Sequence, residues 1–152
     1  MAFQLPKTKM QLSDRYSAIR KQSELFCSPL KIEDYVPQPV AYASPPKWHL
    51  AHITWFFEEM ILAKFVPNYT RFHPDFAFLF NSYYNTIGQR TLRADRGNMT
   101  RPTVDEIYAY RNYVDEAIAS FLDSKAISSE AFELIELGLN HEQQHQELLL
   151  TD

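Results

Sequence analysis

Apolar side chains recur every three or four residues in four stretches of the chain, a spacing typical of amphipathic α-helices. The predicted helices run from about Ser13 to Phe26, from Pro45 to about Phe65, from Val104 to about Leu122, and from Ser128 or Ser129 to the end of the chain. Nine prolines against three glycines favour helices joined by proline-containing loops over a β fold. We therefore expect a single all-α domain, residues 1–152, folded as a four-helix bundle.

Capping signals mark the starts of two of these helices. Ser44 is expected to be the N-cap of the second helix, with Pro45 in its first position. Thr103 followed three residues later by Glu106 predicts a capping box for the third helix. A short additional helix is expected over residues 76–80.

The last helix carries two histidines on its predicted inward face. The predicted inward stripe comprises Leu134, Leu137, Gly138, His141, His145 and Leu148. Residues four apart share one face of a helix, so the imidazoles of His141 and His145 can bind the same metal ion. Gly138 precedes His141 by about one turn and is expected to leave room for a bound group. Helical bundles build metal sites from such inward side chains.

A third ligand is available on the second helix. His52 lies among aromatic residues there, and His49 is close enough along the helix to share its face. If the second and fourth helices are neighbours, His52, His141 and His145 meet, and three imidazoles leave one side of an ion open, as in facial-triad iron sites. The plainer alternative is that these histidines are buried, neutral and hydrogen-bonded. His73, in a loop, is expected to lie at the surface.

The same histidine pair matches the H-E-x-x-H pattern of zinc proteases, but the rest of the chain disfavours that activity. A zinc protease needs a third ligand after the motif, and none of the seven residues that follow His145 is a histidine. Glu142, which would have to act as the general base, follows His141 directly and is expected to face away from the pair.

Composition excludes several other classes of protein. The net charge of −4 argues against nucleic acid as a partner, and 45% apolar with 14% aromatic residues argues against disorder. No apolar run approaches the roughly 20 residues that span a bilayer, and the N-terminus lacks a signal-peptide core. The single cysteine, Cys27, excludes an internal disulfide, is expected to be a buried bystander, and fits a cytoplasmic location.

Three groups of residues then show a resemblance to a known family. They are SPPKWHLAHITWFFE at 44–58, NHEQQHQEL at 140–148 and, between them, RG at 96–97 with TRPTVDE at 100–106 and YR at 110–111. These segments resemble the N-terminal DinB-like domain of ergothioneine-biosynthesis sulfoxide synthases, and the resemblance extends from about Ser13 to Asp152. It implies a four-helix up-down-down-up bundle of the DinB-like kind.

The resemblance also implies an activity and a cofactor. Enzymes of this family hold a non-haem iron(II) with three histidines, which match His52, His141 and His145; zinc or nickel is the expected substitute after purification. They use dioxygen to join a thiol, either cysteine or γ-glutamylcysteine, to Nα-trimethylhistidine, and they oxidise the sulfur to a sulfoxide.

Further residues are assigned to substrate binding by the same resemblance. Gln144 matches a family position near the imidazole of the histidine substrate. Arg90, with Arg93 as the alternate, lies in an arginine-rich loop suited to the carboxylates of the thiol, because guanidinium groups pair with carboxylates in a bidentate manner.

Family enzymes carry a second, C-terminal domain related to formylglycine-generating enzymes, and this chain stops before such a domain. We therefore expect it to be the N-terminal part of a longer two-domain enzyme, with metal binding surviving in the isolated domain and sulfoxide synthesis not. The face that the second domain would cover is expected to support a homodimer.

Two other functions remain open. Stand-alone DinB-like proteins resemble thiol transferases that use zinc or nickel through a similar three-histidine site. A non-catalytic helical scaffold, in which the histidines fill the core, would bind no metal. For a metal site, affinity is expected to fall as the pH drops below about 6.5, because the imidazoles must be neutral to bind.

Overall fold

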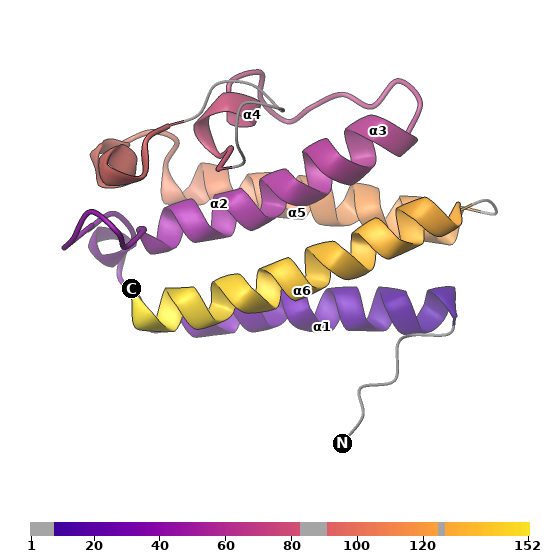
Figure 1. Ribbon diagram of the computed structural model, residues 1–152, viewed down its shortest axis with the longest axis horizontal. Coiled ribbons are helices and arrows are strands. Elements are labelled where there is room, and N and C mark those ends of the chain that lie inside the picture. Colours follow the sequence, from indigo (N-terminus) through magenta and orange to yellow (C-terminus); the bar gives the residue numbers. More distant parts are fainter. Residues whose placement is uncertain (1–7, 83–90, 125–126) are drawn as a thin grey trace.

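The computed structural model describes residues 8–82, 91–124 and 127–152, and within these ranges the secondary structure is helical, without strands. Four long helices make up the molecule (Figure 1): α1 (Lys9–Cys27), α2 (Pro46–Phe57), α5 (Val104–Asp123) and α6 (Ser129–Thr151). The second helix continues through a π-helical turn, η2 (Glu58–Leu62), into α3 (Ala63–Phe65). The shorter elements are η1 (Ile32–Tyr35), α4 (Phe76–Leu79) and η3 (Arg93–Asn98).

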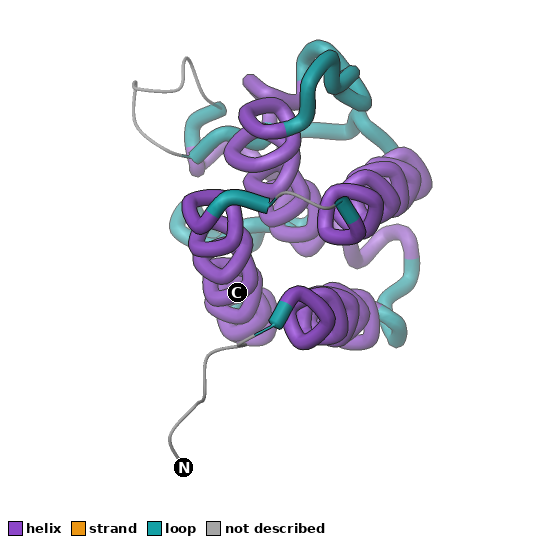
Figure 2. The backbone as a smooth tube through the Cα atoms, turned by 90° about the vertical axis from the view of Figure 1, so that its right-hand side faces the viewer, coloured by secondary structure: helices purple, strands orange, loops and turns teal. Residues whose placement is uncertain are grey.

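The long helices pack in two pairs. In Figure 1, α2 and α5 lie side by side in the upper part and α1 and α6 in the lower part. Contacts between α2 and α6 and between α1 and α5 join the two pairs, and Figure 2 shows the long helices nearly end-on. The core between them is rich in aromatic rings, and among its largest fully buried side chains are Trp48, Trp55, Phe57, Phe80 and Tyr110. None of the helices in the described ranges has the length and apolar character needed to cross a membrane.

The predicted helix starts are confirmed in one case and wrong in another. Thr103 and Glu106 form the expected capping box: the Glu106 amide donates to Thr103 Oγ1 (3.2 Å) and the Thr103 amide to Glu106 Oε2 (2.6 Å). Ser44, in contrast, does not cap α2, because its hydroxyl accepts a hydrogen bond from Arg96 Nη1 (2.9 Å) instead. Pro45 is the N-cap and Pro46 the first helical residue.

A buried group of charged and polar side chains joins the four long helices. We call it the Glu142 cluster; it comprises Arg20, Ser23, Thr54, Arg111 and Glu142. The Glu142 carboxylate accepts from Ser23 Oγ (2.7 Å), Arg20 Nη1 (3.1 Å) and Arg111 Nη2 (3.3 Å), and Thr54 Oγ1 accepts from Arg20 Nη2 (3.0 Å). Burial raises the pKa of Glu142, but the two guanidinium groups outweigh this and hold it below its usual value. Glu142 is therefore a buried anion that faces away from the histidine pair, as predicted.

The inward face of α6 differs from the predicted stripe. Its fully buried positions are Ala131, Ile135, Gly138, Leu139, Glu142 and Gln146. Leu137, predicted to face inward, is 53% exposed, and His141 and His145 are half-buried at the edge of the buried face. The prediction holds for Gly138, is wrong for Leu137, and left out Glu142 and Gln146, which are buried because they find hydrogen-bond partners on α1.

A second buried carboxylate fixes the long segment that follows α3. Glu58, at the start of η2, is fully buried and accepts hydrogen bonds from Tyr110 Oη (2.7 Å), Tyr69 Oη (2.9 Å) and the amide of Phe72 (2.9 Å). This segment leads into the predicted short helix, which the structure confirms as α4. The chain after α4 then reaches His52 on α2, as described next.

Candidate metal centre

The structure brings together the three histidines predicted to share a metal ion. His52 lies in the middle of α2, and His141 and His145 lie one turn apart in α6, which packs against α2. One ligand nitrogen from each ring lies within 4.8 Å of the others. Nitrogens around one zinc ion, each about 2.0–2.1 Å from it, lie closer together than that limit, so the three rings would draw together on binding an ion.

His52 is oriented by its neighbours on every side. Its ring stacks on Trp48 (centroids 4.5 Å apart, planes at 12°) and on Trp55 (5.5 Å, 14°). His52 Nδ1 lies 2.6 Å from the carbonyl oxygen of Phe80, which follows α4. A carbonyl only accepts, so Nδ1 carries the proton and the lone pair is on Nε2, which lies 3.2 Å from Ser82 Oγ. Such backbone hydrogen bonds commonly orient metal-bound histidines.

A fourth histidine, His49, forms a hydrogen bond with His145. His145 Nδ1 lies 2.8 Å from Nδ1 of His49, and Nε2 of His49 lies 3.0 Å from Oδ2 of Asp152. The sequence analysis placed His49 beside His52 and did not consider Asp152. Asp152 could have been predicted to lie near His145, because it follows His145 by seven residues, a spacing that places both on one face of a helix.

Burial keeps these imidazoles neutral, the form that binds metals. It lowers the pKa of His141 to about 4, and it lowers the pKa values of His52 and His145 well below the usual range, with further lowering from the neighbouring histidines. His49 is shifted in the same direction, although its bond to Asp152 opposes the shift. The donor set thus fits a divalent cation, which would be held by neutral nitrogens.

A buried guanidinium lies next to the histidines. Arg96, in η3, places its Cζ 3.4 Å from the centroid of the Trp48 ring and donates to Ser44 Oγ. Its positive charge further disfavours protonation of His52 and His145. The turn that carries it needs the adjacent glycine, because a Cβ on Gly97 would lie 2.5 Å from Cβ of Gln38.

Two of the three predicted substrate residues lie on the surface of the protein. Gln144 is exposed on α6, and Arg93 is exposed at the start of η3. Arg90 lies outside the described residues. The roles assigned to these three side chains stay predictions. Cys27 is buried as expected, and burial raises the pKa of its thiol to about 11.

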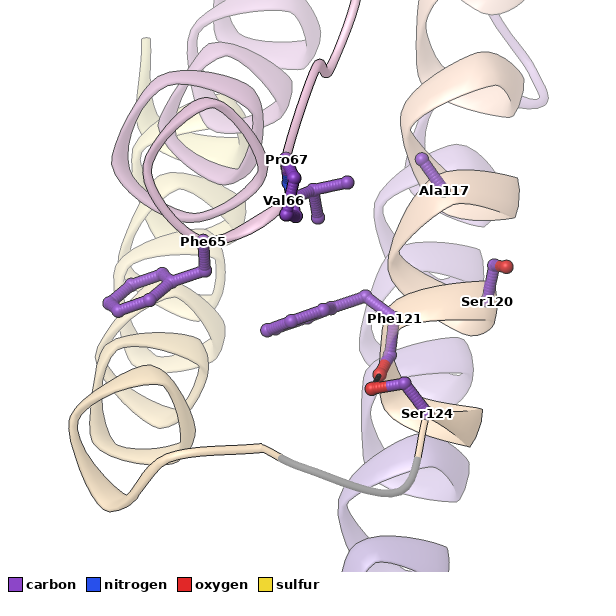
Figure 3. A pocket seen from close by; sticks show the side chains of 7 residues that line it. All are labelled: Phe65, Val66, Pro67, Ala117, Ser120, Phe121 and Ser124. Carbon is purple, nitrogen blue, oxygen red and sulfur yellow. Dashed lines mark hydrogen bonds between the residues drawn. The ribbon is translucent and has the colours of Figure 1, made fainter.

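A separate pocket lies at the other end of the bundle (Figure 3). Its volume is about 530 Å³, and its lining residues are Phe65, Val66, Pro67, Ala117, Ser120, Phe121 and Ser124. Phe65 is 13 residues beyond His52, which corresponds to about 20 Å along a helix. The residues that line this pocket include no ionisable side chain.

The family comparison agrees with the helical architecture. The model of the DinB superfamily matches residues 15–149, and the chain therefore belongs to that superfamily. Among curated proteins, none matches this chain.

Proposed function

We propose that His52, His141 and His145 together bind one divalent metal ion and that this is the function of the domain. The observation that carries the proposal is the convergence of three neutral imidazoles whose ligand nitrogens lie within 4.8 Å of one another. Two of the three rings also have a hydrogen-bond partner at Nδ1, so their Nε2 atoms are the ligand atoms. Histidines that only filled the core would not need to bring their ligand nitrogens together at one point.

We propose further that the domain is the iron(II) domain of a sulfoxide synthase that joins a thiol to Nα-trimethylhistidine. Residues from the three segments that carry the family resemblance meet at this end of the bundle. Ser44 and Trp48 come from the first segment, Arg96 from the second and His145 from the third, and Arg96 contacts both Ser44 and Trp48. The predicted up-down-down-up order of the helices is part of the same proposal, and Figure 1 supports it, because α2 and α5 run in one direction and α1 and α6 in the other.

In this function the described residues have distinct tasks. His52, His141 and His145 would hold the ion, and bound iron(II) would supply the activation of dioxygen. Trp48 and Trp55 exclude water from the buried side of His52. The exposed amide of Gln144, one residue before His145, would contact the histidine substrate as that substrate approaches from solvent.

The test is an anaerobic titration of the metal-free protein with iron(II). Wild type is compared with His52→Ala, His141→Ala and His145→Ala, and with His73→Ala as a control, because His73 is an exposed loop histidine. We expect one-to-one binding in wild type and in the control, and loss of binding in the three variants. Circular dichroism confirms that each variant is folded. Wild-type affinity in any of the three cluster variants, or its absence in wild type, contradicts the proposal.

The second candidate is a thiol transferase that uses zinc or nickel. The donor set favours it to the same degree, because imidazole is a good ligand for zinc and nickel as well as for iron. Thiol transfer separates the two reactions, because the domain alone is expected to bind iron(II) without completing the sulfoxide. The protein is supplied with a thiol and with zinc, nickel or iron(II) in parallel, and oxygen uptake is recorded in an oxygen electrode. Transfer of the thiol with zinc or nickel and without oxygen uptake supports the transferase. Tight iron(II) binding without thiol transfer by any of the metals supports the synthase.

A further inference from the structure

Next to the half-buried His145 lies a chain of hydrogen bonds that runs from His145 through His49 to Asp152. His49 is 2% exposed and the side chain of Asp152 is 13% exposed, so both groups are largely removed from water. Asp152 Oδ2 accepts from the amide of Ser44 (2.8 Å) and lies 3.0 Å from His49 Nε2. The carboxylate is thereby fixed between the end of α6 and the start of α2.

The direction of these bonds follows from the chemistry of the groups. An ionised carboxylate only accepts, so His49 Nε2 carries a proton and, in neutral His49, Nδ1 bears the lone pair. His49 Nδ1 lies 2.8 Å from Nδ1 of His145, so His145 must donate there. The opposite tautomer of His145 would set two lone pairs against each other at this distance.

We infer that His49 and Asp152 are positioning residues: they hold His145 in the tautomer with its proton on Nδ1 and its lone pair on Nε2, ready for a metal ion. The inference rests on the proposed metal site. His52 reaches the same tautomer by a shorter route, since the carbonyl of Phe80 accepts directly from its Nδ1. The two helices thus present matching nitrogens by different means.

The first test is the tautomer itself, measured in the metal-free wild type. Two-bond ¹H–¹⁵N correlations of the imidazole rings distinguish protonated from unprotonated nitrogens, and His145→Ala identifies the signals of His145. We expect His145 Nδ1 to be protonated and Nε2 unprotonated at pH 7.5. A proton on Nε2 of His145 would overturn the inference, whether or not the protein binds metal.

The second test is the affinity for Zn²⁺, measured by calorimetric competition with a chelator. His49→Phe keeps a ring and removes both nitrogens, and we expect affinity to fall about 10–100-fold together with loss of the His145 tautomer preference. His49→Asn restores an acceptor near the former Nδ1 and should recover part of both effects, which a purely structural role of His49 does not predict. His73→Phe is the matched control and should bind like wild type.

Asp152→Asn provides a variant that changes no ring and removes the carboxylate charge. We expect a smaller loss of Zn²⁺ affinity than in His49→Phe and a mixture of His145 tautomers. If both His49→Phe and Asp152→Asn keep the His145 tautomer and bind Zn²⁺ within about twofold of wild type, His49 and Asp152 have no positioning role. If wild type binds no Zn²⁺ at all, the proposed function fails. The tautomer of His145 then decides alone whether His49 and Asp152 position its ring.

Discussion

Two adjacent residues of α6 show how strongly position decides the chemistry of a side chain. His141 is half-buried beside other imidazoles, and burial holds it neutral. Glu142, one residue on and about 100° around the helix, is fully buried and held as an anion by Arg20 and Arg111. The H-E-x-x-H pattern thus contains the histidine pair that we propose binds a metal ion, and a buried carboxylate that is paired with two arginines.

At this scale we expect Glu142→Ala to destabilise the protein by about 3–5 kcal/mol, because it leaves two buried guanidinium groups with one partner fewer. Urea denaturation measures the change. Glu130→Ala is the control: its ion pair with Lys64 is exposed, so its removal should change the free energy of unfolding by less than about 1 kcal/mol. Equal effects in the two variants would contradict the structural role of Glu142.

At the scale of elements, the close approach of α6 to α2 depends on one glycine. The sequence analysis expected Gly138 to leave room for a bound group, and this is wrong. A Cβ at Gly138 would lie 2.6 Å from Cε1 of Phe57 and 2.9 Å from Cε1 of Phe56, so the space belongs to the rings of α2. The absence of a side chain at this position brings the histidines of the two helices together.

We expect Gly138→Ala to push α6 away from α2. Overpacking of this kind costs about 1–3 kcal/mol, partly offset by the helix propensity of alanine, which contributes about 1 kcal/mol. Thermal denaturation should show a lower Tm, and metal titration a weaker affinity, because the separation of His52 from His141 and His145 increases. The neighbouring and exposed Leu137→Ala should leave metal affinity unchanged. A Gly138→Ala protein with wild-type affinity would show that the helix spacing is not limiting.

Some of these elements could be predicted from sequence and others could not. Helical spacing of apolar residues located the four long helices, and the Thr103–Glu106 capping box was confirmed. The rotation of α6 about its axis was missed because Glu142 is polar, and its partners lie on helices distant in sequence. The prediction that Ser44 caps the second helix was wrong for the same reason, because its hydroxyl contacts Arg96, 52 residues away. Local patterns do not record such long-range pairs.

At the scale of the whole molecule, stability is coupled to pH through the buried histidines. The pKa of His141 is lowered to about 4 by burial, whereas an unfolded histidine titrates near 6.5. Between these pH values the unfolded chain binds protons that the folded protein does not. The free energy of unfolding therefore decreases as the pH falls. His49, His52 and His145 are shifted in the same direction and add to the effect.

We therefore expect the free energy of unfolding of the metal-free protein to fall steadily as the pH drops from about 7 to about 4. Urea denaturation at several pH values measures it, and the slope should be smaller in His141→Gln. The same lowered pKa values revise the sequence-based prediction for metal binding. Affinity of the folded protein should persist below pH 6.5, because the folded imidazoles remain neutral there. A loss of zinc centred at pH 6.5 would contradict this.

The Glu142 cluster also has a consequence for protein design. A His-x-x-x-His pair is an easy motif to copy onto another bundle, but here the pair shares its helix with Glu142 and Gln146, which reach Arg20, Ser23 and Arg111 on two other helices. These contacts fix the rotation of α6 about its own axis, and this rotation turns the imidazoles of His141 and His145 toward His52. The smallest unit that could be transferred is therefore residues 138–146 of α6 together with their partners on α1, α2 and α5, including His52. A graft of the two histidines alone would leave the orientation of their rings unspecified.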